Sequence, residues 1–161
     1  MTHKFETIRY GVIAGAAGGL AEIAWISLYA LATGGNAAIL ARGVTTAAGV
    51  SALLPAASVG LGVAVHMTLA VMLGLGLAFA WRAFSAKRGG PANPYPFMLA
   101  ALAGVWAVNF FVVLPLASPA FIHLVPYAVS LTSKLLFGLA AAAVLRRQDE
   151  TVLNARPALL A

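Results

Sequence analysis

The chain has 161 residues, of which 62% are hydrophobic and 9% are charged, and its mean hydropathy is +0.95. A soluble domain usually has about 25% charged residues and could not bury so much apolar surface in one small core, so the composition excludes an ordinary soluble protein. The net charge of +6 lies in basic residues between apolar runs, which is typical of a membrane protein and not of a nucleic-acid-binding surface, and the lack of cysteine excludes disulfides and cysteine-ligated metals.

Four apolar runs are predicted to be transmembrane helices, at about 10–32, 59–81, 97–117 and 124–145. Each is close to the ~20 residues that span a ~30 Å hydrocarbon core, where a helix satisfies its own backbone hydrogen bonds. The first run also resembles a cleavable signal peptide, but it exceeds the usual ~7–15 apolar residues and contains Glu22, so we expect it to stay as a membrane anchor. We therefore expect an all-α fold, in which one transmembrane domain over residues 1–161 forms a four-helix bundle.

The connections between the runs are of different kinds. Asn36 is a favourable N-cap residue, so the outer segment at about 36–50 predicts a short helix in the membrane interface, with Arg42 turned toward the headgroups. Residues 89–96 (GGPANPYP) predict a turn-rich connector on the opposite side, and residues 146–161 predict a tail.

Basic residues outside the runs predict how the chain is oriented. Arg42 is on one side, and eight lie on the other: Lys4, Arg9, Arg82, Lys87, Arg88, Arg146, Arg147 and Arg156. Because cytoplasmic loops carry the excess of lysine and arginine, we expect both termini in the cytoplasm.

Small residues spaced four apart predict close packing between helices. Lipid gives no hydrophobic drive for helix association, so close approach of the backbones matters more. Chance explains a single pair in an alanine-rich run, whereas the overlapping pairs of the first run favour a real packing face. The candidate packing residues are Gly11, Gly15, Gly18, Gly19, Gly74 and Gly138.

The second and fourth runs resemble each other in HMTLAVMLGLGLAFAWR (66–82) and KLLFGLAAAAVLRR (134–147). Each passes from a basic residue through apolar and small residues to a terminal arginine. Duplication of a helical hairpin would give a parallel repeat, and low sequence complexity is the alternative explanation.

Each run carries one strongly polar side chain, and we name Glu22, His66, Asn109 and Lys134 the polar belt. At ~1.5 Å rise per residue, Glu22 and Lys134 fall near the midplane, with Asn109 ~3 Å and His66 ~6 Å closer to the outer face. A charge at this depth costs ~2.5 kcal/mol or more. Lys134 is therefore expected to pair with Glu22, the one acidic residue in any run, with Asn109 or Ser133 completing the hydrogen bonds.

The polar belt has two interpretations. In the first, the acid and the base neutralise each other as a structural ion pair. In the second, the belt is a route for protons or ions, as intramembrane ionisable residues often are. A proton route usually needs titratable groups that reach both surfaces, and the cytoplasmic half of the runs offers almost none, which favours the ion pair.

Histidines raise the question of a b-type haem. His66 is the candidate ligand within a run, but His123 lies in the outer connection, ~10 Å away in depth, which suits one iron poorly. A hydrogen-bonded interior histidine is therefore the first interpretation of His66, and no cofactor is predicted. Arg42 and His123 are the candidate functional residues of the outer face.

No glycine-rich phosphate loop with its lysine, HExxH motif or nucleophile–histidine–acid set occurs in the sequence, so we expect no enzyme. The first functional hypothesis is an accessory or interaction subunit of a membrane complex, or a stress-associated membrane component, that forms a homo-oligomer or joins a larger complex. The alternative is a small transporter or channel for protons, ions or solutes through the polar belt. A haem-binding electron carrier is the second alternative.

Three segments carry a resemblance to a known group: LARGVTTAAG (40–49), LGVAVHMTLAVMLG (61–74) and VNFFVVLPLASPAF (108–121). Together they resemble small four-helix bacterial membrane proteins that are distantly similar to the YagU inner-membrane proteins, which are associated with acid tolerance. The likeness covers most of residues 10–147. It implies a four-helix fold in the bacterial inner membrane, and it implies no reaction. Lys134 stands where the group often has histidine, which counts against a shared two-histidine site.

Overall fold

The structure is a computed structural model that describes residues 2–50, 58–88 and 92–155. Within these ranges the regular elements are helices and there is no strand. In chain order they are α1 (Thr2–Ala32), α2 (Ala37–Ala47), α3 (Ser58–Arg88), α4 (Pro94–Val108), the π-helical turn η2 (Asn109–Val113), α5 (Leu114–Ala117), the 3₁₀ helix η3 (Pro119–His123) and α6 (Tyr127–Ala155).

Four helical segments are long and apolar enough to cross a membrane: Lys4–Ala32, Val59–Arg88, Pro94–Ala117 and Tyr127–Gln148. They correspond to the four predicted runs, and the all-helical fold is confirmed. Their length and composition indicate a multi-pass membrane protein.

The helices differ from the apolar runs at their ends. α1 begins at Thr2 and α3 ends at Arg88, so each adds about two helical turns that carry basic residues. Lysine and arginine form helices well, so the end of an apolar run does not end a helix. Likewise α6 continues to Ala155, through much of the segment predicted as a tail. It begins at Tyr127 because the carbonyl of Pro126 accepts the first bonds of the helix, from the N–H groups of Val129 and Ser130.

The connector predicted at 89–96 is shorter than expected. α4 begins at Pro94, and the side chain of Asn93 accepts a hydrogen bond from the Tyr95 N–H as its N-cap. Proline at the first helical position loses no helical hydrogen bond. Residues 89–91 lie outside the described part of the chain.

α1 crosses α3 with the two backbones in contact at glycines. A Cβ on Gly15 would lie 2.6 Å from the Cα of Val71, and a Cβ on Gly74 would overlap the backbone of Gly15. Real Cβ atoms do not approach other atoms this closely, so the crossing requires glycine at both positions. Gly15 of the first run thus faces α3 at close backbone distance, as helix packing in lipid requires.

The remaining candidate packing glycines also face other elements. Gly11 and Gly19 lie against α3, Gly18 lies against the Phe137 ring of α6, and Gly138 lies near the backbone of Met98 in α4. α6 therefore packs on α1 with one face and on α4 with another.

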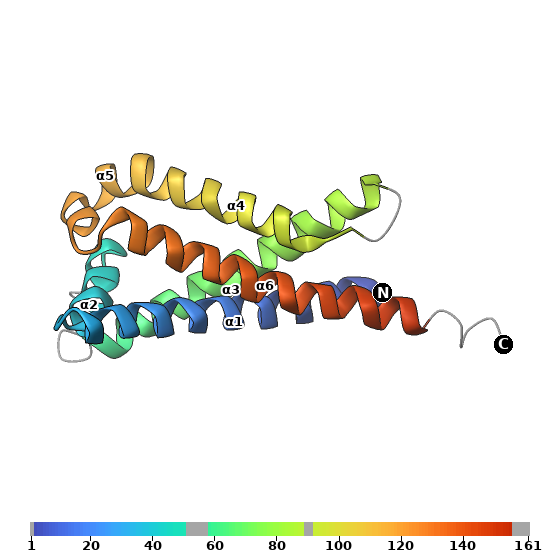
Figure 1. Cartoon of the computed structure of the whole chain (residues 1–161), viewed down its shortest axis with the longest axis horizontal. Coiled ribbons are helices and arrows are strands. Elements are labelled where there is room, and N and C mark those ends of the chain that lie inside the picture. The colour runs from blue at the N-terminus through green and yellow to red at the C-terminus, as the bar shows by residue number, and fades with distance from the viewer. Residues whose placement is uncertain (1, 51–57, 89–91, 156–161) are drawn as a thin grey trace.

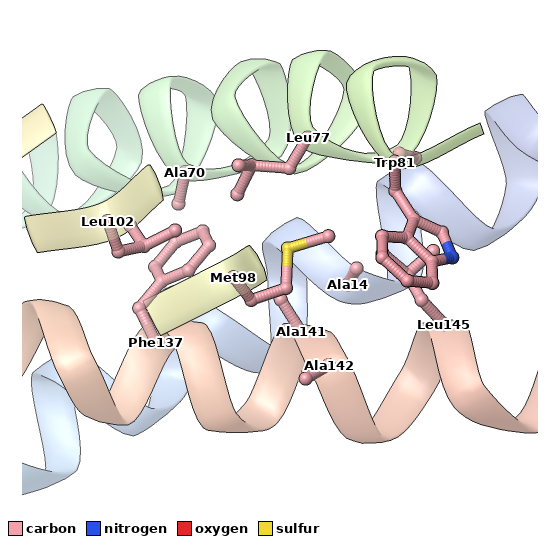
Figure 2. Close-up of a cluster of buried hydrophobic side chains, with 11 residues drawn as sticks. Ala14, Ala70, Leu77, Trp81, Met98, Leu102, Phe137, Ala141, Ala142 and Leu145 are labelled. Atoms are coloured by element: carbon pink, nitrogen blue, oxygen red, sulfur yellow. The ribbon is translucent and has the colours of Figure 1, made fainter. Parts of the chain in front are cut away.

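The apolar core lies between α1, α3, α4 and α6, toward the end where α3 meets α4 (Figure 2). Its largest fully buried apolar side chains are Phe137, Met98, Leu102 and Leu145. Alanines from three helices pack beside them and keep the helices close. Trp81 closes the core, with its ring 5.5 Å from that of Phe97.

The third span is interrupted by the π-helical turn η2. Pro115 has no N–H, and its ring would collide with the carbonyl of Phe111 in a regular α-helix. The helix widens instead, and the Leu114 N–H bonds the carbonyl of Asn109, five residues back. Sequence inspection did not predict this turn.

α2 lies beside the N-terminal end of α3. Asn36 is its N-cap as predicted and accepts a hydrogen bond from the Ala38 N–H at 2.9 Å. α2 packs tightly on α3, because a Cβ on Gly62 would overlap the carbonyl of Ala41. Thr45, which is buried, lies in the same contact.

The ends of the helices fall into two groups (Figure 1). The start of α1, the end of α3, the start of α4 and the later part of α6 lie at one end of the molecule, and α2 and η3 lie at the other. The first group carries seven basic residues of the described chain: Lys4, Arg9, Arg82, Lys87, Arg88, Arg146 and Arg147. This charge asymmetry has the form that the positive-inside rule describes.

Candidate functional site

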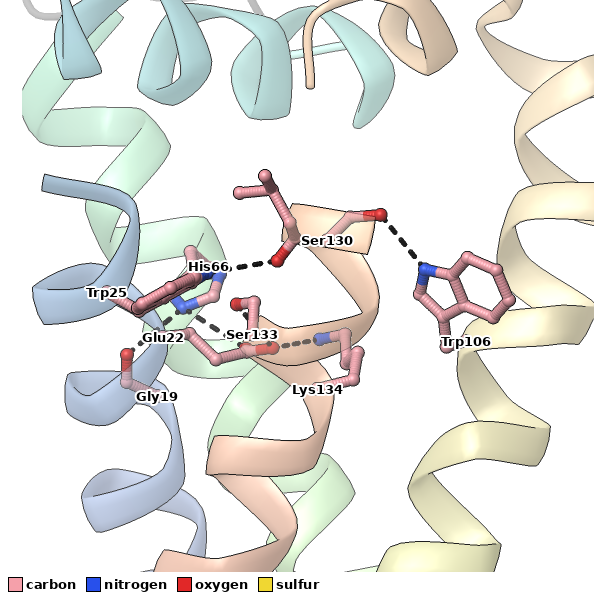
Figure 3. A network of polar contacts seen from close by, with 9 residues as sticks. Gly19, Glu22, Trp25, His66, Trp106, Ser130, Ser133 and Lys134 are labelled. Carbon is pink, nitrogen blue, oxygen red and sulfur yellow. Dashed lines mark hydrogen bonds and ion pairs between the residues drawn. The ribbon is translucent and has the colours of Figure 1, made fainter. Parts of the chain in front are cut away.

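Glu22 and Lys134 are in direct contact. Glu22 on α1 is nearly fully buried, with 4% of its side chain exposed, and the Lys134 Nζ on α6 lies 2.7 Å from its Oε1 (Figure 3). This distance is typical of a charge-assisted hydrogen bond. The contact expected from the sequence is therefore present, and it joins the first span to the last.

His66 on α3 is the third member of the site. Its Nε2 lies 3.7 Å from Glu22 Oε2 and 3.4 Å from the carbonyl oxygen of Gly19. Both distances exceed the ~2.7–2.9 Å of a charge-assisted hydrogen bond, so His66 interacts only weakly with the carboxylate and with the Gly19 carbonyl. We name Glu22, His66 and Lys134 the charge cluster; each comes from a different helix.

The two carboxylate oxygens of Glu22 have unequal surroundings. Oε1 takes the contact from Lys134 and a hydrogen bond of 3.4 Å from the Ser133 Oγ. Oε2 is buried and has no hydrogen-bond partner among the residues that the structure describes, because His66 Nε2 is too distant to donate well. Most buried polar atoms are paired, and an unpaired one costs about 1–3 kcal/mol. Oε2 is therefore a site where a bound proton or donor would be stabilised.

Access to the cluster differs between its members. The side chains of Lys134 and His66 are 21% and 25% exposed, whereas Glu22 is enclosed. In Figure 3 the two bases approach the carboxylate from opposite sides, in agreement with their contacts to different oxygens. Lys134 also lies above the Phe137 ring, with Nζ 5.8 Å from its centroid.

Two tryptophans tie neighbouring helices to α6 beside the cluster. The Trp25 Nε1 of α1 donates to the carbonyl of Val129, and the Trp106 Nε1 of α4 donates to Ser130 Oγ, both at 3.0 Å. Ser130 in turn donates to the Tyr127 carbonyl. These bonds lie about one turn along α6 from Lys134, so they fix the helix that presents it. Nothing in the sequence beyond the aromatic character of the two residues indicates these partners.

Asn109, the fourth residue of the polar belt, does not join the cluster. It begins the π-helical turn η2 and is partly buried, and its side chain makes no hydrogen bond to Glu22, His66 or Lys134 within the described chain. Depth along a span says nothing about the direction of a side chain around the helix axis. Of the two hydrogen-bond partners expected for Glu22, Ser133 is present and Asn109 is not.

The outer-face candidates lie away from the cluster. Arg42 is exposed on α2, and His123 is exposed at the end of η3, beside a shallow open hollow that Val125, Pro126 and Tyr127 also line. His123 and His66 therefore belong to different parts of the molecule.

A second polar contact between spans lies near the end of the molecule where α1 begins and α3 ends. The Arg82 Nη1 of α3 donates to the Oγ1 of Thr7 on α1 at 2.7 Å, and Thr7 is buried. The sequence predicts Arg82 outside the apolar run, because an arginine after such a run usually marks its end. Nothing in the sequence indicates that Thr7 contacts another span.

No protein-family model, curated protein or solved structure matches the chain. The charge cluster itself is therefore the basis for any functional conclusion.

Proposed function

We propose that this chain is a small multi-pass protein of the bacterial inner membrane, with both termini in the cytoplasm, that moves protons through the charge cluster. Its four candidate spans and the basic residues gathered at one end support the location and the orientation. In a four-helix bundle of this kind, the cluster would lie near the middle of the membrane.

The proposal rests on a third titratable group, His66, that lies beside Glu22 and Lys134. A structural ion pair needs Glu22 and Lys134 only, and it is most stable when every carboxylate oxygen is hydrogen-bonded. Here Oε2 has no such partner, and His66 stands 3.7 Å from it. An acid held between two bases has two alternative partners, which is what a site that takes up and releases a proton requires.

The geometry suggests how a proton would move. A proton that reaches the partly exposed imidazole of His66 makes it cationic and attracts it to Oε2, which weakens the hold of Lys134 on Oε1. Transfer to the carboxylate or return to water then restores the starting state. Histidine is a common proton shuttle in proteins, because its ring nitrogens can take up and release a proton.

Proton flux through reconstituted vesicles tests this function. The purified full chain is reconstituted in proteoliposomes with a trapped pH dye and a pH gradient, and valinomycin with potassium removes the membrane potential. Under these conditions the protein should carry protons. Glu22→Gln should reduce the flux to the level of protein-free vesicles, because the amide cannot exchange a proton. His66→Asn should reduce it as well.

Thr132→Val is the matched control, since Thr132 lies on α6 two residues from Lys134 and its Oγ1 bonds the Ala128 carbonyl of its own helix. This variant should keep the full flux. Flux that Glu22→Gln leaves unchanged, or no flux in the unmodified protein, contradicts the proposal.

A second function, association in the membrane as a subunit of a homo-oligomer, is favoured by the third span. α4 packs on α6 with one face, and Val108 of α4, Phe111 of η2 and Leu116 of α5 are exposed, with Leu116 83% exposed. If a second copy covers this face, the protein in mild detergent should have at least twice the 16.5 kDa mass of one chain by light scattering with the detergent subtracted. Phe111→Ser should reduce that mass to one chain, and a monomeric unmodified protein would contradict this function.

A further inference from the structure

We propose that the charge cluster carries one small monovalent anion together with one proton, and that Lys134 is the group that binds the anion. This inference rests on the proposed proton movement and adds its co-substrate. It follows from the charge balance of the cluster and from which of its members are accessible.

The charge balance limits what the cluster can accept. With His66 neutral, the Glu22 carboxylate and the Lys134 ammonium cancel, and the cluster has no net charge. Among the described residues of α1, α3, α4 and α6, the other charged side chains lie toward the end of the molecule that holds the start of α1 and the end of α3, and Arg42 is exposed on α2. A net charge at mid-membrane is costly, so the cluster can hold an added ion only together with an opposite charge.

Accessibility determines the sign of that ion. The Glu22 side chain is enclosed, with 4% of it exposed, whereas the Lys134 and His66 side chains are 21% and 25% exposed. An incoming cation would meet the two basic groups first and would be repelled by Lys134. An incoming anion would meet a cationic donor whose present partner, Glu22 Oε1, is itself an anion that can be exchanged.

Anion binding at Lys134 then requires a proton on the other side of the carboxylate. When the anion replaces Oε1 on Nζ, Glu22 loses its counter-charge and the cluster carries one negative charge. One proton, taken from water onto His66 Nδ1, restores neutrality and makes the Nε2–H, 3.7 Å from Glu22 Oε2, the charged donor that this oxygen lacks. One anion and one proton therefore bind together, and the loaded and empty clusters are both neutral.

Chloride, with gluconate as the large control anion, is the probe. The full chain is reconstituted in proteoliposomes, and internal pH and chloride are followed with trapped dyes after an inward chloride gradient is applied. We expect chloride entry to acidify the interior with one proton per chloride, at a rate that does not change when valinomycin and potassium set different membrane potentials. Gluconate should give no acidification.

Variants separate the anion site from the proton site. Lys134→Met should abolish the chloride-driven acidification, and Lys134→Arg, which keeps the charge, should preserve it, so that loss in both would contradict a role in binding the anion. His66→Asn should remove the coupled proton. Thr132→Val should behave as the unmodified chain.

The outcomes distinguish this inference from the proposed function. Proton flux that is equal in chloride and gluconate, or that follows the membrane potential, overturns the anion coupling and leaves proton movement in place. An absence of proton flux in chloride and in gluconate alike overturns both the anion coupling and the proposed proton movement.

Discussion

Lys134→Met is expected to lower the free energy of unfolding by about 3–5 kcal/mol, because it leaves the Glu22 carboxylate buried without its counter-ion. Glu22 is 4% exposed, and its remaining polar contacts are the Ser133 hydroxyl and the distant His66, so little else in the described structure can compensate. Glu22→Leu should cost less, since the Lys134 that it leaves unpaired is 21% exposed.

The double variant Glu22→Leu, Lys134→Met tests whether the two residues act as a pair. Removing both charges removes the cause of the penalty, so the double variant should recover much of the stability that the single changes lose. Unfolding of the purified protein in mild detergent on addition of sodium dodecyl sulfate, followed by circular dichroism, measures these free energies. A double variant that loses as much as the sum of the singles would show that the residues are not coupled.

Gly74→Leu is expected to produce the second large loss, about 3 kcal/mol or more, at the upper end for an overpacked site. Any Cβ at this position overlaps the backbone of Gly15 and crowds the Gly11 carbonyl. A side chain could rotate away, but a helix backbone cannot, so α1 and α3 must move apart and lose the close contact that holds them.

Gly76→Leu provides the matched control on the same helix, because a Cβ there meets no atom within 4 Å. Leucine also favours helix more than glycine by roughly 0.5–1 kcal/mol, so this variant should be as stable as the unmodified chain or slightly more so. The same detergent unfolding assay compares the two. Equal losses at both positions would mean that helix propensity, and not the crossing, sets the cost.

Several features of this chain follow from the sequence because they depend on composition and local spacing. The length and apolarity of the four runs determine the four candidate spans, since a helix is the structure that pairs its own backbone in lipid. The N-cap at Asn36 is local chemistry and is present. The pairing of Glu22 with Lys134 could be anticipated although the two are far apart in sequence, because each is the one residue of its charge at that depth.

The direction of each side chain around its helix depends on the tertiary structure. Depth arithmetic put Asn109 closer to the midplane than His66, yet His66 lies at the carboxylate and Asn109 does not contact it. These directions are set by contacts between helices, such as the glycine crossing of α1 and α3, and no local pattern encodes such contacts. The sequence determined which groups must avoid lipid, and the packing of three helices determined which of them meet.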